Sequence, residues 1–198
     1  TPSFTVNDEK EFYHCFATGE HGNIFDFVMK TQNLRFGETV KYLASIAGMK
    51  PYIFSKQDEE REKDWNNYKE IYKNYVEYYH NELLNNNSSS EAKSYIKNRG
   101  LKLEDVQNFK IGFVTKEIDF YEFLLKKFDK IDINNSGIFY FDEKKQKHIN
   151  RFRERIIFPI KNISGDVIAI GGRSIKENNF SAKYINSPET QFFKKGSN

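Results

Sequence analysis

One stretch, between residues 58 and 84, constrains the fold more than any other part of the sequence. Its large apolar side chains recur every three or four residues, the spacing of one helix face: Trp65, Tyr68, Tyr72, Tyr75, Tyr79 and Leu83. A run of Asn and Ser at residues 85–90 ends the pattern. Such a helix needs other elements to cover its aromatic face, so the stripe predicts the centre of a hydrophobic core. The alternative is an exposed platform on which nucleic-acid bases stack.

The periodicity differs on either side of this helix. Residues 3–6 and 12–16 alternate as two short strands of a hairpin, and two short helices follow at about 24–29 and 37–47. After the long helix, the spacing predicts the following elements: helices at 90–98, 103–109 and 119–128, strands at 110–114, 156–160 and 167–170, and a loop at 129–137. We therefore expect an α+β chain, with a hairpin and short helices first and then helices packed on a small mixed sheet.

The chain divides into two parts by composition. Residues 51–57, which begin with Pro51, have the character of a linker between a part at 1–50 and a part at 58–198. The sequence starts at Thr1 without a methionine, and we interpret it as a fragment. No run approaches the roughly 18–20 apolar residues of a membrane span, so no membrane partner is expected. The single cysteine, Cys15, rules out an internal disulfide and fits a reducing, cytoplasmic compartment.

Positive charge gathers in the last quarter of the chain. Residues 151–198 contain nine Lys or Arg and four Asp or Glu, a balance of +5, whereas residues 1–150 have 22 and 24, a balance of −2. A basic excess confined to one region suggests an anionic partner such as nucleic acid.

The basic region opens with Arg-Phe-Arg-Glu-Arg at residues 151–155. In extended chain, alternate side chains share a face, so Arg151, Arg153 and Arg155 would line one face about 6.5–7 Å apart. That spacing matches the phosphates of an extended single strand. The alternative is a solvated strand face with local ion pairs.

Further basic groups follow beside aromatic ones. Gly-Gly-Arg at residues 171–173 lets a backbone or ligand approach closely while Arg173 offers its rigid guanidinium fork. Lys183, Tyr184 and Asn186 come next, and Lys195 lies near the end of the chain. Basic residues interleaved with aromatic rings are typical of single-stranded nucleic-acid binding.

Cys15 lies at the end of the first hairpin, where a zinc ribbon carries a Cys-x-x-Cys knuckle. The second cysteine position is Thr18, whose neutral hydroxyl is a poor zinc ligand. His14 and His21 are near in sequence, but the simpler interpretation is one buried thiol and two surface histidines. The sequence also contains no Walker A loop, nucleophile elbow, His-Glu-x-x-His or Asp-x-Asp pair. It has the features of a template-binding part without its reaction centre.

Two sets of motifs resemble bacterial DnaG-type DNA primases. The motifs similar to the zinc-binding domain of that family are Thr-Pro-Ser-Phe-Thr-Val at 1–6, Phe-Tyr-His-Cys-Phe at 12–16 and His-Gly-Asn at 21–23. Those similar to the N-terminal part of its RNA polymerase domain lie at residues 95–101, 109–113, 151–155, 158–160, 171–173 and 183–190. The motifs occur in order and span nearly the whole chain.

The resemblance implies a DNA-directed RNA polymerase that makes RNA primers from ribonucleotides on single-stranded DNA at the bacterial replication fork. It also implies that basic and amide groups line a DNA groove: Arg99, Arg151, Arg153, Arg173, Lys183, Asn186 and Lys195. The catalytic carboxylates and Mg²⁺ would belong to a following Toprim domain, so no catalytic residue is expected in this chain. A further C-terminal domain would contact the replicative helicase.

The chain departs from the family pattern at its zinc site. A Cys-x-x-His half-site would precede Thr1, and Thr18 stands at the fourth ligand position. We therefore expect zinc to be held weakly, by Cys15 with His21 as a substitute ligand, or not at all. A rival function is a non-catalytic single-stranded DNA-binding module from a degenerate primase.

Overall fold

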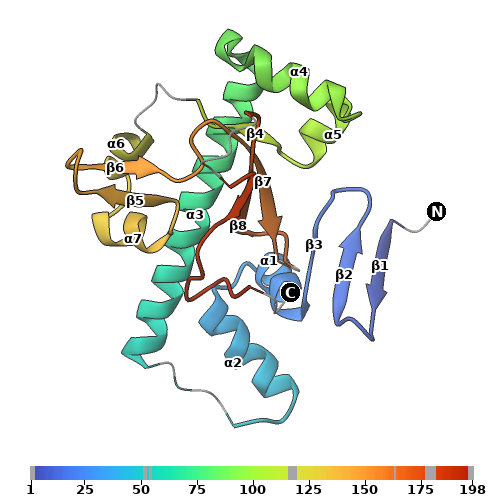
Figure 1. Cartoon of the computed structure of the whole chain (residues 1–198). Coiled ribbons are helices and arrows are strands. Elements are labelled where there is room, and N and C mark those ends of the chain that lie inside the picture. Colours follow the sequence, from blue (N-terminus) through green and yellow to red (C-terminus); the bar gives the residue numbers. More distant parts are fainter. Residues whose placement is uncertain are drawn as a thin grey trace. The chain divides into compact units, whose positions relative to one another are not determined.

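The computed structural model describes residues 3–50, 53, 55–115, 120–162, 164–176 and 182–195. The chain forms two compact units (Figure 1). Unit 1 comprises Thr1–Lys63 with Lys161–Asp166, and unit 2 comprises Asp64–Ile160 with Val167–Asn198. The sequence analysis instead places the division at a linker, residues 51–57, and the boundary of the units falls inside the long helix that follows it.

Unit 1 contains a three-stranded antiparallel sheet and two helices. In the order β1-β2-β3, its strands are Phe4–Asn7, Phe12–Cys15 and His21–Gly22. Helices α1 (Ile24–Gln32) and α2 (Phe36–Ile46) follow. The predicted hairpin and both short helices are thus confirmed, and β3 is an addition.

The core of unit 1 is small and aromatic. The Tyr13 ring is buried, and its centroid lies 5.5 Å from that of Phe4 and 5.3 Å from that of Phe27. Asn23 and Asp26 form a capping box that starts α1, because each side chain accepts a hydrogen bond from the backbone of the other. This cap fixes the point at which the ribbon turns into the helix.

Unit 2 is organised around the long helix α3 (Lys56–Asn85), most of which belongs to it. Figure 1 shows α3 between the β5–β6 hairpin on one side and the four-stranded sheet on the other. The aromatic stripe faces this core: Tyr68 is 4% exposed, and Tyr72, Tyr75 and Tyr79 are 0% exposed. The prediction of a buried face is confirmed, and the stacking-platform alternative is excluded for these tyrosines.

The buried tyrosines of α3 keep their hydroxyls satisfied. Tyr68 donates to the Ile168 carbonyl at 2.6 Å, and Tyr72 donates to the Ser136 carbonyl at 2.8 Å. The Tyr75 hydroxyl donates to Oδ1 of Asn150 at 2.9 Å. Each ring therefore adds apolar area to the core without leaving a buried donor unpaired.

The remaining elements of unit 2 form two sheets and several short helices. The four-stranded sheet has the order β4-β7-β8-β9, with strands Gly112–Phe113, Arg155–Lys161, Val167–Ser174 and Tyr184–Asn186. The second sheet pairs β5 (Phe139–Asp142) with β6 (Lys147–Asn150). The helices are η1 (Asn87–Ser89), α4 (Ser90–Asn98), α5 (Leu103–Asn108), α6 (Phe120–Leu125) and α7 (Lys130–Asn135).

Three features of unit 2 differ from those predicted from the sequence. The predicted loop at 129–137 contains the helix α7, and its Ile133 is fully buried, which packs the helix against the core. A mixed sheet was expected, and the two registers described within it, β4 with β7 and β8 with β9, are both antiparallel. The predicted helix at 119–128 corresponds to the shorter α6, and residues 116–119 lie outside the described residues. Among the helices that the structure describes, none is both long and apolar enough to cross a membrane.

Candidate nucleic-acid interface

The register of β8 and β9 places the key polar residues on one side of the sheet. Arg173 lies opposite Tyr184, and Gly171 lies opposite Asn186. Gly172 faces the other way, because a Cβ there would lie 2.5 Å from Cδ1 of the buried Phe152. The Gly-Gly pair was expected to admit a ligand. At Gly172 the space is instead taken by the core.

The guanidinium of Arg173 lies between two tyrosine rings. Its carbon is 5.1 Å from the centroid of Tyr95 and 4.7 Å from that of Tyr184, within the range of a cation–π contact. Arg99, which follows α4, lies 5.4 Å from the Tyr95 centroid, and its Nε donates to the Tyr95 hydroxyl at 3.1 Å. We call Tyr95, Arg99, Arg173 and Tyr184 the arginine–tyrosine cluster.

Arg173 is a buried cation with an unused donor. It is only 8% exposed, and its Nε has no hydrogen-bond partner among the described residues. Leaving such a donor unpaired costs about 1–3 kcal/mol. Because Nε is itself sealed from solvent, an anionic oxygen would recover that cost only when the side chains around it move to admit it. Tyr184 is 62% exposed, so one of its faces is open to a stacking base.

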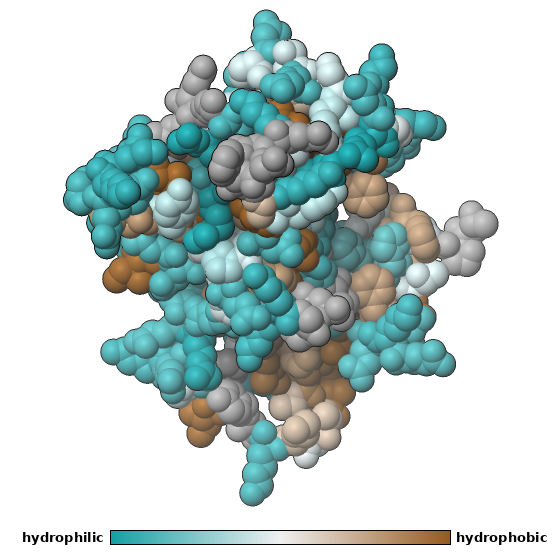
Figure 2. Space-filling model, in the orientation of Figure 1, coloured by the Kyte–Doolittle hydropathy of each residue, from teal (hydrophilic) through white to brown (hydrophobic). Residues whose placement is uncertain are grey.

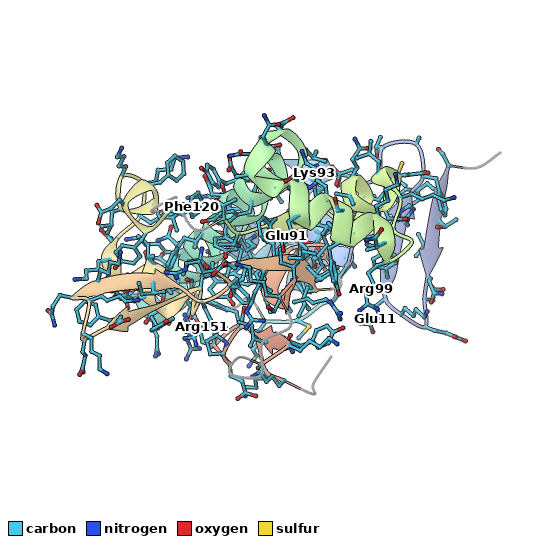
Figure 3. The ribbon with its side chains drawn as sticks, turned by 45° about the horizontal axis from the view of Figure 1, so that its top comes forward. Glu11, Glu91, Lys93, Arg99, Phe120 and Arg151 are labelled. Atoms are coloured by element: carbon cyan, nitrogen blue, oxygen red, sulfur yellow. The ribbon has the colours of Figure 1, made fainter. Side chains whose placement is uncertain are left out.

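A second basic site lies beside the β5–β6 hairpin. Arg151, Arg153 and Arg155 line one polar cavity of about 310 Å³, together with Lys145 and Lys176. We call this cavity the arginine pocket. In Figure 3, the labelled Arg99 and Arg151 appear on opposite sides of the β7 and β8 ribbons. In the orientation of Figure 1, the surface over α4 and the β5–β6 hairpin is mostly hydrophilic (Figure 2).

The arginine pocket forms by a different geometry from the one predicted. Residues 151–154 are a turn, not an extended strand, and Glu154 has a positive φ of 58°. Phe152 is fully buried in the core, and this anchor forces the chain to turn. The expectation that the three arginines alternate along a strand face is therefore wrong, although the turn still brings them to one cavity.

Contacts within the fold hold two of the three arginines of the pocket in place. Nε of Arg151 donates to the Gly137 carbonyl at 3.0 Å, and its guanidinium lies 5.6 Å from the Tyr140 centroid. Arg155 is 8% exposed, its Nη1 donates to the Lys183 carbonyl at 3.3 Å, and burial lowers its pKa from the usual value. Arg153 is exposed.

The other expected groove residues are spread along β9 and beyond. Lys183 is exposed, and its backbone carbonyl, next to Tyr184 in the chain, accepts a hydrogen bond from Arg155 of the pocket. Asn186 is exposed on β9, on the Arg173 face. Lys195 is exposed as well, and its backbone N–H donates to the Glu189 carboxylate at 3.0 Å. No described contact joins Lys195 to either basic site.

Two residues of this surface, Tyr95 and Lys176, were not predicted from the sequence as site residues. Tyr95 was noted only within a motif, yet its ring contacts two arginines. Arg99 follows Tyr95 by four residues, which is about one helical turn, and this spacing was an available signal. Lys176 was overlooked. It reaches the pocket from beyond β8 and pairs with Glu154 at 2.8 Å, which raises the pKa of Lys176.

The hairpin end in unit 1 does not gather metal ligands. The rings of His14 and His21 lie opposite each other on neighbouring strands, 5.9 Å apart. Cys15 follows His14 on β2, so its side chain points to the other face of the ribbon. Cys15 is only half-buried, so the expectation of a buried thiol is wrong. The Thr18 hydroxyl donates a hydrogen bond to the Cys15 thiolate, which, with the Thr18 amide, lowers the pKa of that thiol. Within the described residues, no three His, Cys, Asp or Glu side chains form a group that could hold a metal.

Comparison with known proteins connects the basic surface to one family. Residues 78–198 match the family described as the N-terminal domain of the DNA primase catalytic core, and residues 1–60 match the CHC2 zinc finger. The chain belongs to the DNA primase family. The first match includes every residue of the arginine–tyrosine cluster and the arginine pocket. The resemblance drawn from the sequence motifs is confirmed.

Individual relatives agree with this assignment. A DNA primase from Clostridium acetobutylicum is 36% identical over 200 residues, which cover 100% of this chain and 33% of that protein. A structure of a DnaG primase catalytic domain bound to ssDNA has a TM-score of 0.59 and 29% identity, covering 68% of this chain and 41% of that one. The zinc-binding and RNA polymerase domains of Aquifex aeolicus primase give a TM-score of 0.56 and 29% identity, covering 100% and 46%. The chain spans about a third of the length of the curated relatives it matches.

Proposed function

We propose that this chain holds the single-stranded DNA template of a DNA primase, a DNA-directed RNA polymerase that synthesises short RNA primers for replication. The observation that carries the proposal is Arg173, a buried cation with an unpaired Nε beneath an exposed tyrosine ring. That combination suits a nucleotide, which brings a phosphate oxygen for the donor and a base for the ring.

The two basic sites have separate tasks in this proposal. The arginine–tyrosine cluster binds one phosphate at Arg173 and stacks a base on Tyr184. The arginine pocket attracts further phosphates through Arg151 and Arg153, and the exposed Lys183, whose backbone carbonyl accepts from Arg155, adds one more positive charge. Because phosphate contacts carry no sequence information, binding is largely indifferent to base sequence. The ssDNA in the related catalytic-domain structure supports this function by analogy.

The chemical step belongs elsewhere in the whole protein. We propose nucleotidyl transfer of ribonucleotides by carboxylates and Mg²⁺ outside this chain, with no catalytic residue among the 198. We also propose that the whole protein contacts the replicative helicase through another domain, and that it acts in the bacterial cytoplasm. The chain incubated alone with template, ribonucleotides and Mg²⁺ should yield no labelled oligoribonucleotide above a no-enzyme control.

Zinc is a separate question. Residues 1–60 match a zinc-finger family, but the residues present here do not fit a zinc site, because Cys15 and His21 point to opposite faces of the ribbon. No step of the proposed function depends on zinc. Elemental analysis after dialysis should give less than about 0.2 zinc per chain, since structural zinc needs about four ligands.

The direct experiment measures the affinity of the 198-residue chain for labelled oligonucleotides by fluorescence anisotropy. We expect two single strands of different sequence to bind with similar affinity. The logarithm of the affinity should fall with the logarithm of salt concentration by about 0.7 for each phosphate contacted. Sequence-specific binding, or affinity that does not change with salt, would refute the proposal.

One observation favours the rival function, a non-catalytic DNA-binding module from a degenerate primase. Thr18 stands where a thiolate is expected, so part of the family pattern is lost. Both functions use the same DNA surface, so the binding experiment does not separate them. Primer synthesis by the full-length protein does, because only the enzyme makes oligoribonucleotides.

A further inference from the structure

A second concave surface of unit 2 has no part in the proposed template site. The end of α3, together with α4 and α5, encloses a groove of about 590 Å³. We call it the lysine-rimmed groove and define it by its apolar floor, Leu83, Ile96 and Val106, and its basic rim, Lys93, Lys97 and Lys102. The residues described around it include none of the arginine pocket or the arginine–tyrosine cluster.

The floor of the groove is aliphatic and partly open. Leu83, Ile96 and Val106 belong to the buried core beneath it. Leu103, the first residue of α5, also lines the groove and is 62% exposed. The volume lies within the roughly 300–1,000 Å³ of small binding pockets, enough for a few large apolar side chains. An exposed leucine at the mouth of such a groove is available for contact.

The rim of the groove is positive. The ammonium of Lys93, labelled on α4 in Figure 3, donates to the carbonyls of Leu84 and Asn86 at 3.0 and 3.4 Å, so it stabilises the end of α3. Lys97 and Lys102 are exposed, and neither forms an ion pair with the residues that the structure describes. The nearby Asp105 carboxylate already accepts the Lys102 backbone N–H at 2.8 Å.

We propose that the lysine-rimmed groove binds a short acidic segment of a partner protein. Large apolar side chains of that segment fill the groove, and its flanking carboxylates pair with Lys97 and Lys102. Apolar anchors give such a contact its affinity, and complementary charge gives it orientation and rate. The proposal does not depend on the template function, because it uses none of the residues assigned to DNA.

Two other occupants fit the groove less well. Nucleic acid would gain phosphate pairs at the rim, but the lining described for the groove contains no aromatic ring on which a base could stack. A second copy of the chain would need a larger surface, since a stable interface involves about 20–30 residues on each side. A single peptide segment matches both the size and the charge of this surface.

The test begins with a randomised peptide display library panned against the 198-residue chain. Enriched peptides should combine Asp or Glu with Leu, Ile or Phe. The best of them, remade with a fluorescent label, should bind in an anisotropy titration. Failure to enrich any peptide, or enrichment of peptides without acidic residues, would overturn the proposal.

Variants then locate the binding site. Lys97→Glu and Leu103→Ser should each lower the affinity for the labelled peptide by about tenfold, because each removes a main contact. Leu103 is largely exposed, so its truncation leaves the fold intact, as a thermal melt would confirm. The matched control is Lys130→Glu at the exposed start of α7, which should leave the affinity unchanged. An equal loss in the control would mean diffuse charge attraction and would refute the groove.

Two further measurements address the other occupants. A single-stranded oligonucleotide should not displace the peptide. If it does, the groove belongs to the template surface and the proposal fails. Sedimentation should show the same mass for the wild-type chain and for Leu103→Ser. A dimer that this substitution dissociates would assign the groove to a second copy and overturn the proposal as well. Because template affinity is measured separately, failure here leaves the proposed DNA function untouched.

Discussion

Two groups of tyrosines in unit 2 show how one residue type serves two purposes. The tyrosines of α3 are buried, and their hydroxyls bond to fixed groups of the core, as in the contact of Tyr72 with the Ser136 carbonyl. Tyr95 and Tyr184 instead lie against the guanidinium of Arg173, and Tyr184 is mostly exposed. In the first group, the hydroxyls form their hydrogen bonds within the fold and the rings are covered. The second group leaves ring surface accessible to a ligand.

The difference shows that aromatic content alone does not identify a nucleic-acid surface. What separates the groups is what each ring packs against: other aromatic rings in the core, and cations at the surface. A ring beside an arginine offers stacking next to a phosphate-binding charge, and that pairing is what a single strand requires.

The largest effect should follow truncation in the core group. Tyr75 is fully buried and contacts Tyr79, Phe120 and Phe152, so Tyr75→Ala should lower the free energy of unfolding by about 3–5 kcal/mol. Urea denaturation measures the loss. A change under about 1 kcal/mol would mean that the ring is not packed as the structure shows.

Alkaline pH should lower the stability of the folded protein through the same buried tyrosines of α3, without any mutation. Burial raises the pKa of Tyr72 and Tyr75 well above the usual value, so the folded state keeps protons that the unfolded state loses. Stability is then complete below the unfolded pKa of about 10 and falls as pH rises above it. Denaturation midpoints at several pH values test this, and Tyr72→Phe, which has no proton to lose, should flatten the decline.

The core face of β8 should respond to a single added carbon. A Cβ at residue 172 would lie 2.5 Å from Phe152 and 3.3 Å from Arg155, so Gly172→Ala should cost about 1–3 kcal/mol of stability. The neighbouring Gly171→Ala is the control, since its Cβ would meet only Asn186 Oδ1 at 3.4 Å and the Phe158 carbonyl at 3.8 Å. Equal thermal melts for the two variants would contradict the assignment of faces.

The surface group should affect binding and not stability. Tyr184→Ala should weaken the binding of a single-stranded oligonucleotide by about 1–2 kcal/mol, the range of a lost base stack. Tyr184→Phe should retain most of the affinity. Both variants should melt close to the wild type, because Tyr184 is exposed. If the phenylalanine variant loses as much as the alanine one, the hydroxyl and not the ring face makes the contact.

Periodic elements of this fold could be predicted, and contacts across the chain could not. The stripe on α3 follows from spacing alone, as does the first hairpin. The turn at residues 151–154 depends on Phe152 entering the core opposite Gly172, a contact that no local pattern reveals. α7 was missed because its Asn-Asn-Ser ending resembles a loop and only the buried Ile133 fixes it.

The same limit applies to the candidate site. Arg173 could be selected from its motif, but its burial between two rings depends on Tyr95, which comes from a helix 78 residues earlier. The opposite orientation of Cys15 and His21 could have been foreseen, because alternate residues of a strand face opposite ways and His21 pairs with His14. Sequence therefore identifies the chemistry of the surface, and the fold decides which groups act together.

The most direct test of the central claim is a salt titration of oligonucleotide binding by Arg173→Ala beside Lys126→Ala, an exposed lysine just after α6. Arg173→Ala should weaken binding about tenfold and reduce the salt slope by about 0.7, the share of one phosphate, while Lys126→Ala leaves both nearly unchanged. A thermal melt of each variant confirms that it is folded. If the two variants lose equal affinity, or if Arg173→Ala keeps the wild-type slope, the arginine–tyrosine cluster is not where the template binds.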